Sequence, residues 1–96
     1  MGRGLILRQA KFTTSFKRDL KRQKKRGNSR DKIEIIIELI CTNGDAPAKY
    51  FPHNLSGNWK GYRECHIEPD WLLIYSIESD ELAVFYRTGT HSDLFS

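Results

Sequence analysis

The chain has 96 residues, a mass of 11.2 kDa and a formal net charge of +4. Hydrophobic residues make up 39% and charged residues 29%, which fits a folded soluble domain and not a disordered chain. A chain of this length can enclose one hydrophobic core, so we expect a single domain over residues 1–96. No stretch approaches the ~18 apolar residues of a membrane span and no signal peptide opens the chain, so we expect a cytoplasmic protein without membrane contact.

Positive charge is concentrated in the first third of the sequence. Residues 1–32 contain twelve Lys and Arg against two Asp, a net charge of +10, whereas residues 33–96 contain four bases against ten acids, a net charge of −6. This asymmetry indicates a polyanionic partner, either a nucleic acid or an acidic protein. A charge run can also be no more than the solvated face of a helix, and charge alone does not choose between these interpretations.

Two helices are predicted in the first half, after a short apolar run at residues 5–7 that is typical of a strand. Phe12, Phe16 and Leu20 recur every four residues, a one-sided helical stripe that ends at Gly27-Asn28. The second helix begins near residue 29 or 31, ends at Asn43-Gly44, and is expected to form an antiparallel hairpin with the first. Its apolar stripe consists of Ile33, Ile36, Ile37 and Ile40.

The second half changes to the two-residue period of strands. Residues 42–58 are rich in Gly, Pro, Asn and Ser and are predicted to form a long loop. Strands are predicted over 59–67, 70–77 and 81–87, and residues 88–96 form a tail. The element order β-α-α-β-β-β predicts an α+β domain with the helical hairpin packed on an antiparallel meander. Cys41 and Cys65 are too few for a disulfide framework and are expected to be buried, reduced thiols.

All three histidines, His53, His66 and His91, lie in this second half. Cleavage of RNA without a metal needs a base for the 2′-OH proton, an acid for the leaving 5′-oxygen and a cation for the phosphate. Histidine suits either proton role and arginine suits the phosphate. The other groups that could take part in such a site are Lys60, Arg63, Asp70, Arg87 and the base-stacking rings Trp71 and Phe95.

Each of these residues also has a purely structural interpretation. A strand histidine is often a satisfied structural residue, Trp71 can belong to the core, and Arg87 can pair with a carboxylate such as Glu64 or Glu68. Three histidines and an aspartate can also bind zinc, but neither an H-x-x-x-H nor an H-x-x-E-H spacing occurs, so no metal site is predicted.

Two sequence patterns favour the RNA-cleaving interpretation. Residues His53–Trp71 read H-x-L-x-G-x-W-x-x-x-R-x-x-H-x-x-P-D-W, and residues Arg87–Phe95 read R-x-G-x-H-x-x-L-F. The chain thereby resembles the YafQ branch of the RelE/ParE superfamily of bacterial toxins. The resemblance implies the same β-α-α-β-β-β fold and a ribosome-dependent endoribonuclease that cleaves mRNA in the A site, inhibits translation and is silenced by an antitoxin. It implies no cofactor and no metal.

Carried over to this sequence, the resemblance implies an active site in which His91 and Asp70 share the proton transfers, supported by His53 and His66. Arg87 would hold the scissile phosphate, and Phe95 would pack on a base or hold the tail. Trp71 is a weaker candidate for substrate contact that can instead support Asp70. The catalytic set is therefore His53, His66, Asp70, Arg87, His91 and Phe95, with Trp71, Lys60 and Arg63 as substrate-binding candidates.

The basic helices are expected to face ribosomal RNA, or to receive an acidic antitoxin segment that folds on binding. The candidates are Lys17, Lys21, Arg22, Lys24, Lys25 and Arg26. We expect a monomer when free and a hetero-oligomer with the antitoxin. Three other functions remain open: a gyrase poison of the same superfamily without hydrolytic activity, a catalytically inactive RNA- or antitoxin-binding module, and a ribonuclease that cuts naked RNA.

Overall fold

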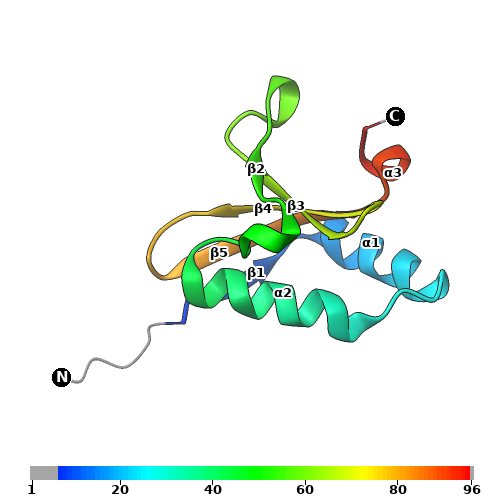
Figure 1. The fold of residues 1–96 in the computed structure, drawn as a ribbon, viewed down its shortest axis with the longest axis horizontal. Helices are drawn as coiled ribbons and strands as arrows, with labels where there is room; N and C mark the ends of the chain where they lie inside the picture. Colours follow the sequence, from blue (N-terminus) through cyan, green and yellow to red (C-terminus); the bar gives the residue numbers. More distant parts are fainter. Residues whose placement is uncertain (1–6, 96) are drawn as a thin grey trace.

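A five-stranded mixed sheet forms the centre of the computed structural model, which describes residues 7–95 (Figure 1). The strand order is β1-β5-β4-β3-β2, with β1 parallel to β5 and every other pair antiparallel. The strands are β1 (Gln9–Phe12), β2 (His53–Asn54), β3 (Arg63–Glu68), β4 (Trp71–Ile77) and β5 (Leu82–Gly89). The α+β class and the helical hairpin are confirmed, and the predicted meander corresponds to β3, β4 and β5.

Two helices, α1 (Thr14–Lys25) and α2 (Arg30–Asn43), run antiparallel on one face of the sheet (Figure 1). The Thr13 side chain caps α1 by accepting a hydrogen bond from the Phe16 amide at 3.0 Å. Gly44 ends α2 in the left-handed conformation with φ 82°, where a Cβ would be strained. The end of α2 at Gly44 agrees with the sequence prediction. None of the helices within residues 7–95 is long and apolar enough to cross a membrane.

Strand β4 separates two hydrophobic clusters because its side chains alternate between the faces of the sheet. Leu73 and Tyr75 join Phe16, Ile33 and other apolar residues under the helices. Leu72 and Ile74 point to the opposite face. There they pack with Leu55, Trp59, Tyr62, Tyr86 and Leu94.

The beginning and the end of the chain differ from the prediction. The strand predicted at residues 5–7 lies largely outside the described residues, and the first strand, β1, begins at Gln9. Phe12 belongs to β1 and not to the helix, and its ring stacks on Phe16 with the centroids 5.3 Å apart. Parallel pairing of β1 with β5 makes the sheet mixed, which a local period of two cannot reveal.

The loop and tail contain short elements that the sequence prediction left out. The loop holds the 3-10 turns η1 (Ala48–Tyr50) and η2 (Gly57–Trp59) with β2 between them, so Trp59 lies before β3 rather than in it. The tail forms a helix, α3 (His91–Phe95). In Figure 1, α3 and the β2–η2 segment rise on the side of the sheet opposite α1 and α2.

Both cysteines are buried and free, as expected. Burial raises the pKa of the Cys65 thiol to about 12, because the thiolate would lose its hydration in the core. The thiol of Cys65 therefore stays protonated at physiological pH.

A carboxylate under the sheet ties the long loop to the core. Asp45 accepts hydrogen bonds from Arg63 Nε at 3.0 Å, Arg63 Nη2 at 2.7 Å and the Tyr75 hydroxyl at 2.5 Å. Burial raises the pKa of Asp45, but the hydrogen bonds from Arg63 and Tyr75 outweigh burial and leave this pKa lowered. Arg63 also donates to Asn54 Oδ1 at 2.8 Å, so the same guanidinium fixes strand β2.

We expect Asp45→Asn to lower the free energy of unfolding at pH 7 by about 1–3 kcal/mol, because Arg63 and Tyr75 lose a charged acceptor. A carboxylate whose pKa is lowered by folding stabilises the protein above its unfolded pKa of about 3.9, and this contribution is lost as the pH falls through the folded value. The difference in the free energy of unfolding between wild type and variant should therefore shrink as the pH falls from about 5 toward 2.

Urea unfolding across this pH range measures the effect. Glu38→Gln serves as the control, because Glu38 is an exposed acid that makes none of these contacts. If the difference in the free energy of unfolding between wild type and Asp45→Asn stays constant with pH, the role assigned to the Asp45 carboxylate is contradicted.

Candidate active site

The three histidines converge on the sheet face opposite the two long helices. His53 lies on β2, His66 on β3, and His91 at the start of α3. The ring centroids of His53 and His66 are 5.9 Å apart, and those of His66 and His91 are 6.1 Å apart. Residues separated by up to 38 positions in the sequence are thus neighbours, as the resemblance implied.

Each histidine directs its Nδ1 toward an oxygen acceptor. The Nδ1 of His53 lies 2.9 Å from the Phe51 carbonyl, that of His66 lies 3.4 Å from the Pro69 carbonyl, and that of His91 lies 2.6 Å from Asp70 Oδ1. Because an oxygen acceptor is satisfied by an N–H, these contacts favour hydrogen on Nδ1. The Nε2 atom is therefore the ring nitrogen that His66 and His91 have available for other chemistry, whereas Nε2 of His53 lies 3.0 Å from Glu64 Oε1.

Asp70 fixes both the backbone and the ring of His91. Its Oδ1 accepts hydrogen bonds from the His91 amide at 2.9 Å and from the ring Nδ1 at 2.6 Å. The backbone hydrogen bond and then the ring hydrogen bond lower the pKa of Asp70, so its carboxylate stays ionised. A carboxylate behind an imidazole fixes the tautomer and orientation of the ring and stabilises its protonated form.

The short helix α3 is attached to α1 through Asp93. Arg26 donates to Asp93 Oδ2 at 2.6 Å and to Oδ1 at 3.0 Å, and Gln23 Nε2 lies 3.3 Å from Oδ2. Asp93 also accepts from the Thr90 amide at 2.9 Å, while its own amide donates to the Thr90 hydroxyl at 3.0 Å. This reciprocal pair is a capping box, which starts the helix that carries His91.

Gly89 is required for this attachment. A Cβ at this position would lie 2.8 Å from Asp93 Oδ2 and 2.9 Å from Asp93 Cβ, closer than real Cβ atoms approach other atoms. The glycine in R-x-G-x-H therefore leaves room for the carboxylate that positions the following histidine.

Arg87 is bound to α1. Its Nε donates to Asp19 Oδ2 at 2.6 Å and its Nη2 to Oδ1 at 3.2 Å, and the Thr88 amide also donates to Oδ2 at 3.1 Å. The hydrogen bond to Asp19 raises the pKa of Arg87, and the charge of Asp93 contributes in the same direction. Arg87 does pair with a carboxylate, but with Asp19 and neither Glu64 nor Glu68. The remaining terminal nitrogen, Nη1, takes no part in the Asp19 pair.

Two predicted substrate contacts are corrected by the structure. Trp71 is only 2% exposed and its indole N–H donates to the Thr88 hydroxyl at 2.9 Å, so its ring belongs to the core and is not available to stack on a base. Arg63 is used by Asp45 and Asn54, because it lies on the helix-facing side of β3. Lys60 is exposed directly after η2, and its substrate contact stays a prediction.

Two exposed aromatic rings border the histidines. The Phe95 ring centroid lies 6.5 Å from that of His91. Phe51, which the sequence analysis did not single out, is 70% exposed and meets His66 edge-on at 6.2 Å. It adopts a left-handed conformation with φ 52°, uncommon for a residue other than glycine, and its carbonyl is the one that faces His53. Exposed rings of this kind can stack on unpaired bases.

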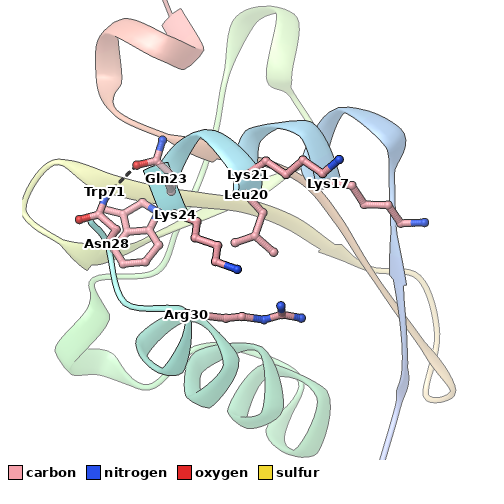
Figure 2. Close-up of a pocket in the computed structure, with 8 residues that line it drawn as sticks. All are labelled: Lys17, Leu20, Lys21, Gln23, Lys24, Asn28, Arg30 and Trp71. Carbon is pink, nitrogen blue, oxygen red and sulfur yellow. Dashed lines mark hydrogen bonds between the residues drawn. The ribbon is translucent and has the colours of Figure 1, made fainter. Parts of the chain in front are cut away.

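The basic residues of α1 fall into two groups. Arg22 lies 3.7 Å from Asp93 and Arg26 is bound to it, so these two residues hold α3. Their contact with RNA or antitoxin stays a prediction. Among residues 7–95, Lys17, Lys21, Lys24 and Lys25 are exposed and form no ion pair. Figure 2 shows Lys17, Lys21 and Lys24 beside a groove between α1 and α2. The groove is also lined by Leu20, Gln23, Asn28, Arg30 and Trp71.

Sequence reasoning missed four residues that shape the site. No local pattern marks Asp19 or Phe51. For Asp93 the available signal was the T-x-x-D spacing of a capping box at Thr90 and Asp93. Glu64 is paired with His53 across the β2–β3 ladder, with Oε1 3.0 Å from Nε2. The alternation of strand β3 was the available signal, because it places Glu64 on the same face as His66.

Comparison with known proteins identifies the class to which this fold and site belong. Residues 8–96 match the family model described as a bacterial toxin of type II toxin-antitoxin systems, YafQ. The chain therefore belongs to the YafQ toxin family.

Individual relatives agree with this assignment along almost the whole chain. The chain is 41% identical to the mRNA interferase toxin YafQ of Escherichia coli K12 over 92 residues, which cover 95% of this chain and 99% of the relative. The YafQ chain in the E. coli DinJ-YafQ toxin-antitoxin complex superposes with a TM-score of 0.83 at 41% identity, covering 95% of this chain and 100% of that one. A metal-bound toxin from Helicobacter pylori superposes with a TM-score of 0.82 at 34% identity. The match covers 93% of this chain and 99% of that toxin.

The attachment of α3 to α1 predicts different effects for two adjacent basic residues. We expect Arg26→Ala to increase amide hydrogen exchange across residues 91–95, because Asp93 loses its bidentate partner. Lys25→Ala removes the same charge from an exposed side chain that does not contact Asp93, and it should leave this exchange unchanged. Mass spectrometry can compare the amide hydrogen exchange of the two variants. Equal protection of α3 in both variants would refute the attachment.

Proposed function

We propose that this toxin is an endoribonuclease that cleaves mRNA in the ribosomal A site and thereby inhibits translation. The observation that carries the proposal is the arrangement of His91, which is held by Asp70 through Nδ1 and is 6.1 Å from His66 between ring centroids. The name of the 41% identical E. coli relative, mRNA interferase toxin, supports the same activity. The proposed reaction needs no metal or cofactor.

Cleavage proceeds by attack of the 2′-OH on the adjacent phosphorus. One group removes the 2′-OH proton as the new O–P bond forms, and another gives a proton to the 5′-oxygen as its bond to phosphorus breaks. His91 supplies one transfer through Nε2 while Asp70 keeps its ring oriented, so the role of Asp70 is positioning. His53 and His66 supply or support the other transfer.

The phosphate requires positive charge as the reaction proceeds. Arg87 is the proposed ligand, and its Nη1 is the atom that can contact a phosphoryl oxygen while Asp19 keeps the rest of the guanidinium in place. Phe95 and the exposed ring of Phe51 are positioned to pack on the bases on either side of the scissile bond. Lys60 lies at the loop tip and can contact the RNA backbone.

The free lysines of α1 are the proposed contact with ribosomal RNA, because phosphate contacts depend on charge and not on sequence. We propose that a cognate antitoxin protein binds this toxin in the cytoplasm and silences it. The DinJ-YafQ complex of E. coli supports an antitoxin partner for the family. An acidic antitoxin segment on the same lysines would exclude ribosomal RNA. The free toxin is proposed to be a monomer that becomes part of a hetero-oligomer on binding.

We expect primer extension on programmed bacterial ribosomes to show breaks confined to the A-site codon with the wild-type toxin. His91→Gln should lower the cleavage rate by at least about 100-fold, within the range of a missing proton-transfer group. Lys11→Ala provides the control, because Lys11 is an exposed base on β1, at the edge of the sheet opposite β2.

Each alternative function gives a different result in this experiment. Breaks on naked RNA would identify a free ribonuclease. Growth inhibition that persists in His91→Gln would identify a non-catalytic binder. The absence of breaks with folded wild-type toxin would overturn the proposal and make gyrase inhibition the next assay.

The lysine surface predicts a change in the salt dependence of ribosome binding. Reversing the charge of Lys17, Lys21 and Lys24 to Glu should weaken binding and lower the slope of log affinity against log salt concentration by roughly 2–3, about 0.7–0.9 for each phosphate that is no longer neutralised. These substitutions spare Arg22 and Arg26, so α3 stays attached. If the slope of log affinity against log salt concentration equals that of the wild type, the lysines of α1 do not contact the ribosome.

A further inference from the structure

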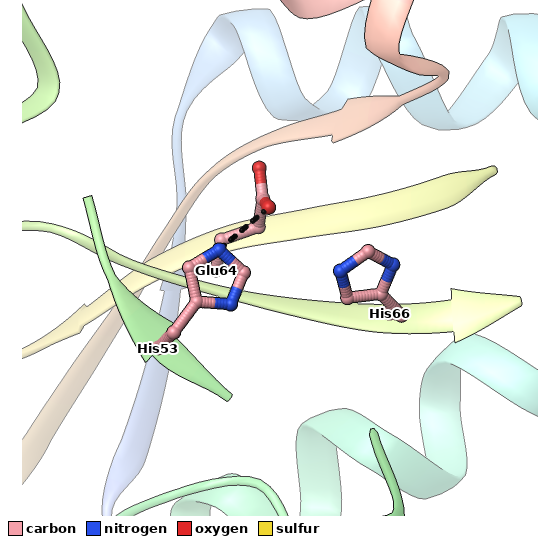
Figure 3. A group of neighbouring side chains, drawn as sticks. All are labelled: His53, Glu64 and His66. Carbon is pink, nitrogen blue, oxygen red and sulfur yellow. Dashed lines mark ion pairs between the residues drawn. The ribbon is translucent and has the colours of Figure 1, made fainter. Parts of the chain in front are cut away.

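A hollow of about 690 Å³ adjoins the histidine cluster at His66, and its volume is typical of small-molecule sites. Figure 3 shows His66 on the same strand as Glu64, next to the contact between Glu64 and His53. The hollow is lined by His66 but by neither His53 nor His91. It therefore extends from the middle of the cluster into space that the other two histidines do not border.

Strand β3 borders this hollow because it has no neighbouring strand along most of its outer edge. Among the described residues, β2 pairs only with Arg63 and Glu64, and the hollow lies between the turn η1 and residues 66–69. The register of β3 against β4 shifts between His66 and Glu68, which marks a bulge. Bulges re-aim side chains and are common next to active sites. The end of β3 therefore presents its side chains to open space instead of to another strand.

Phe51 supplies an aromatic wall of the hollow. Its ring is 70% exposed and meets the His66 ring edge-on, with the centroids 6.2 Å apart. The Phe51 amide donates to the Ala48 carbonyl at 3.0 Å, and the Phe51 carbonyl lies 2.9 Å from His53 Nδ1. These contacts hold Phe51 in its left-handed conformation, which is costly for a bulky residue and often marks a functional contact. An exposed ring on a backbone fixed in this way is already positioned to stack on a flat ligand.

Two opposite charges lie at the rim of the hollow. Lys49 is exposed, and its ammonium lies 5.2 Å from the centroid of the Tyr50 ring. The Glu68 side chain is 38% exposed, and its Oε2 accepts a hydrogen bond from Lys32 Nζ at 2.9 Å. Because Oε1 takes no part in this pair, Glu68 is held in place with one oxygen left to accept a further hydrogen bond.

This combination of groups matches the chemistry of a nucleotide. A flat base stacks on an aromatic ring, a phosphate is attracted to a lysine ammonium, and a base amino group donates to a carboxylate. Because an ionised carboxylate only accepts hydrogen bonds, Glu68 favours adenine, cytosine and guanine, which carry an exocyclic amino group. Uracil carries a carbonyl oxygen where cytosine carries its amino group, so Glu68 disfavours uracil.

We propose that this hollow, the Phe51 hollow, binds one nucleobase of the mRNA codon and selects against uracil. Phe51 stacks on the base, Glu68 accepts a hydrogen bond from its amino group, and Lys49 contacts the adjacent phosphate. The bound nucleotide is next to the scissile bond, because His66 belongs to both the hollow and the proposed active site. Selection of this kind rests on the proposed nuclease function and makes the cleavage rate depend on the codon.

Cleavage of mRNA on programmed ribosomes tests the selection, with the A-site codon varied one position at a time through all four bases. At one codon position, the wild type should cleave codons with adenine, cytosine or guanine at least about 10-fold faster than the codon with uracil, the scale of one mismatched base contact. Glu68→Gln should raise the rate on the uracil codon and reduce this ratio below about 3-fold, because an amide also donates hydrogen bonds. The matched control is Glu38→Gln, which should keep the ratio, because Glu38 is an exposed acid of α2 that does not line the hollow.

Substitution of the Phe51 ring tests the stacking. Phe51→Ala should lower the cleavage rate about 10-fold or more for every base at that position, within the range for loss of one base–aromatic stack, and Phe51→Trp should retain the rate. Equal rates for the wild type and Phe51→Ala would overturn the hollow as a base site. Unchanged cleavage combined with weaker antitoxin binding would identify a protein-docking surface instead. Acceptance of uracil at every codon position, or an unchanged ratio in Glu68→Gln, would overturn the selection.

Binding measured without cleavage separates a failure of the hollow from a failure of the nuclease function. The trinucleotides AAA and UUU, 2′-O-methylated so that they cannot be cleaved, are each added at millimolar concentration to the full-length toxin. In nuclear magnetic resonance spectra, AAA should shift the amide signals of residues 49–51 and 66–68 more strongly than UUU does. The absence of these shifts would overturn the hollow whatever the cleavage result. Shifts at the hollow in a toxin that cleaves no mRNA on ribosomes would contradict the nuclease function and leave the base site intact.

Discussion

The position of His91 depends on the carboxylate of Asp93. The helix that carries His91 has five residues, too few to be stable alone, and Leu94 is its buried residue. Bidentate contact with Arg26 attaches this helix to the C-terminal end of α1, where a cation is also favoured by the helix dipole. The Arg26 hydrogen bond holds the pKa of Asp93 far below its ordinary value, so the contact persists throughout the physiological pH range.

The alternation of strand β4 keeps this site separate from the core. Residues facing α1 and α2 form the larger apolar cluster, so the helices can be held firmly without any contribution from the histidines. On the other face, the smaller cluster around Leu72 and Ile74 supports the β2–η2 loop and α3. The histidines lie at the rim of that second cluster, where a ring can be oriented by one hydrogen bond and still reach solvent.

Periodicity predicted the parts of the fold that are determined by nearest neighbours along the chain. The isoleucine stripe of α2, the helix ends and the three antiparallel strands follow from local patterns of this kind. The parallel position of β1 does not, because it depends on a partner strand more than seventy residues away. Phe12 illustrates the ambiguity: its side chain contacts Phe16 as a helical stripe requires, but it does so from a strand.

The candidate site was predictable to the extent that motif residues contact one another. His53, His66, Asp70 and His91 lie together as the family pattern implied. Arg63 and Trp71 are also specified positions of the motif, but their side chains make structural contacts with Asp45 and Thr88. A specified position of a motif can therefore serve packing as well as chemistry. Glu64 occupies a variable position of the quoted pattern, and only the register of β2 with β3 brings it to His53.

The charge asymmetry of the sequence is partly balanced inside the molecule. Arginines of the basic third pair with acids of the other two thirds, as in the contacts of Arg8 with Asp80 and of Arg26 with Asp93. Arginine is suited to this because its planar fork makes two directed hydrogen bonds, whereas the lysine ammonium is a hydrated point charge on a flexible stem.

The positive charge left for a polyanionic partner is therefore smaller than the +10 of the first 32 residues, and it is carried mainly by lysine. On α1 the division follows the geometry of the helix. Arg22 and Arg26 are four residues apart and face α3, while Lys17, Lys21 and Lys24 line the groove toward α2. One helix thus positions the candidate active site with its arginines and presents a separate cationic surface with its lysines.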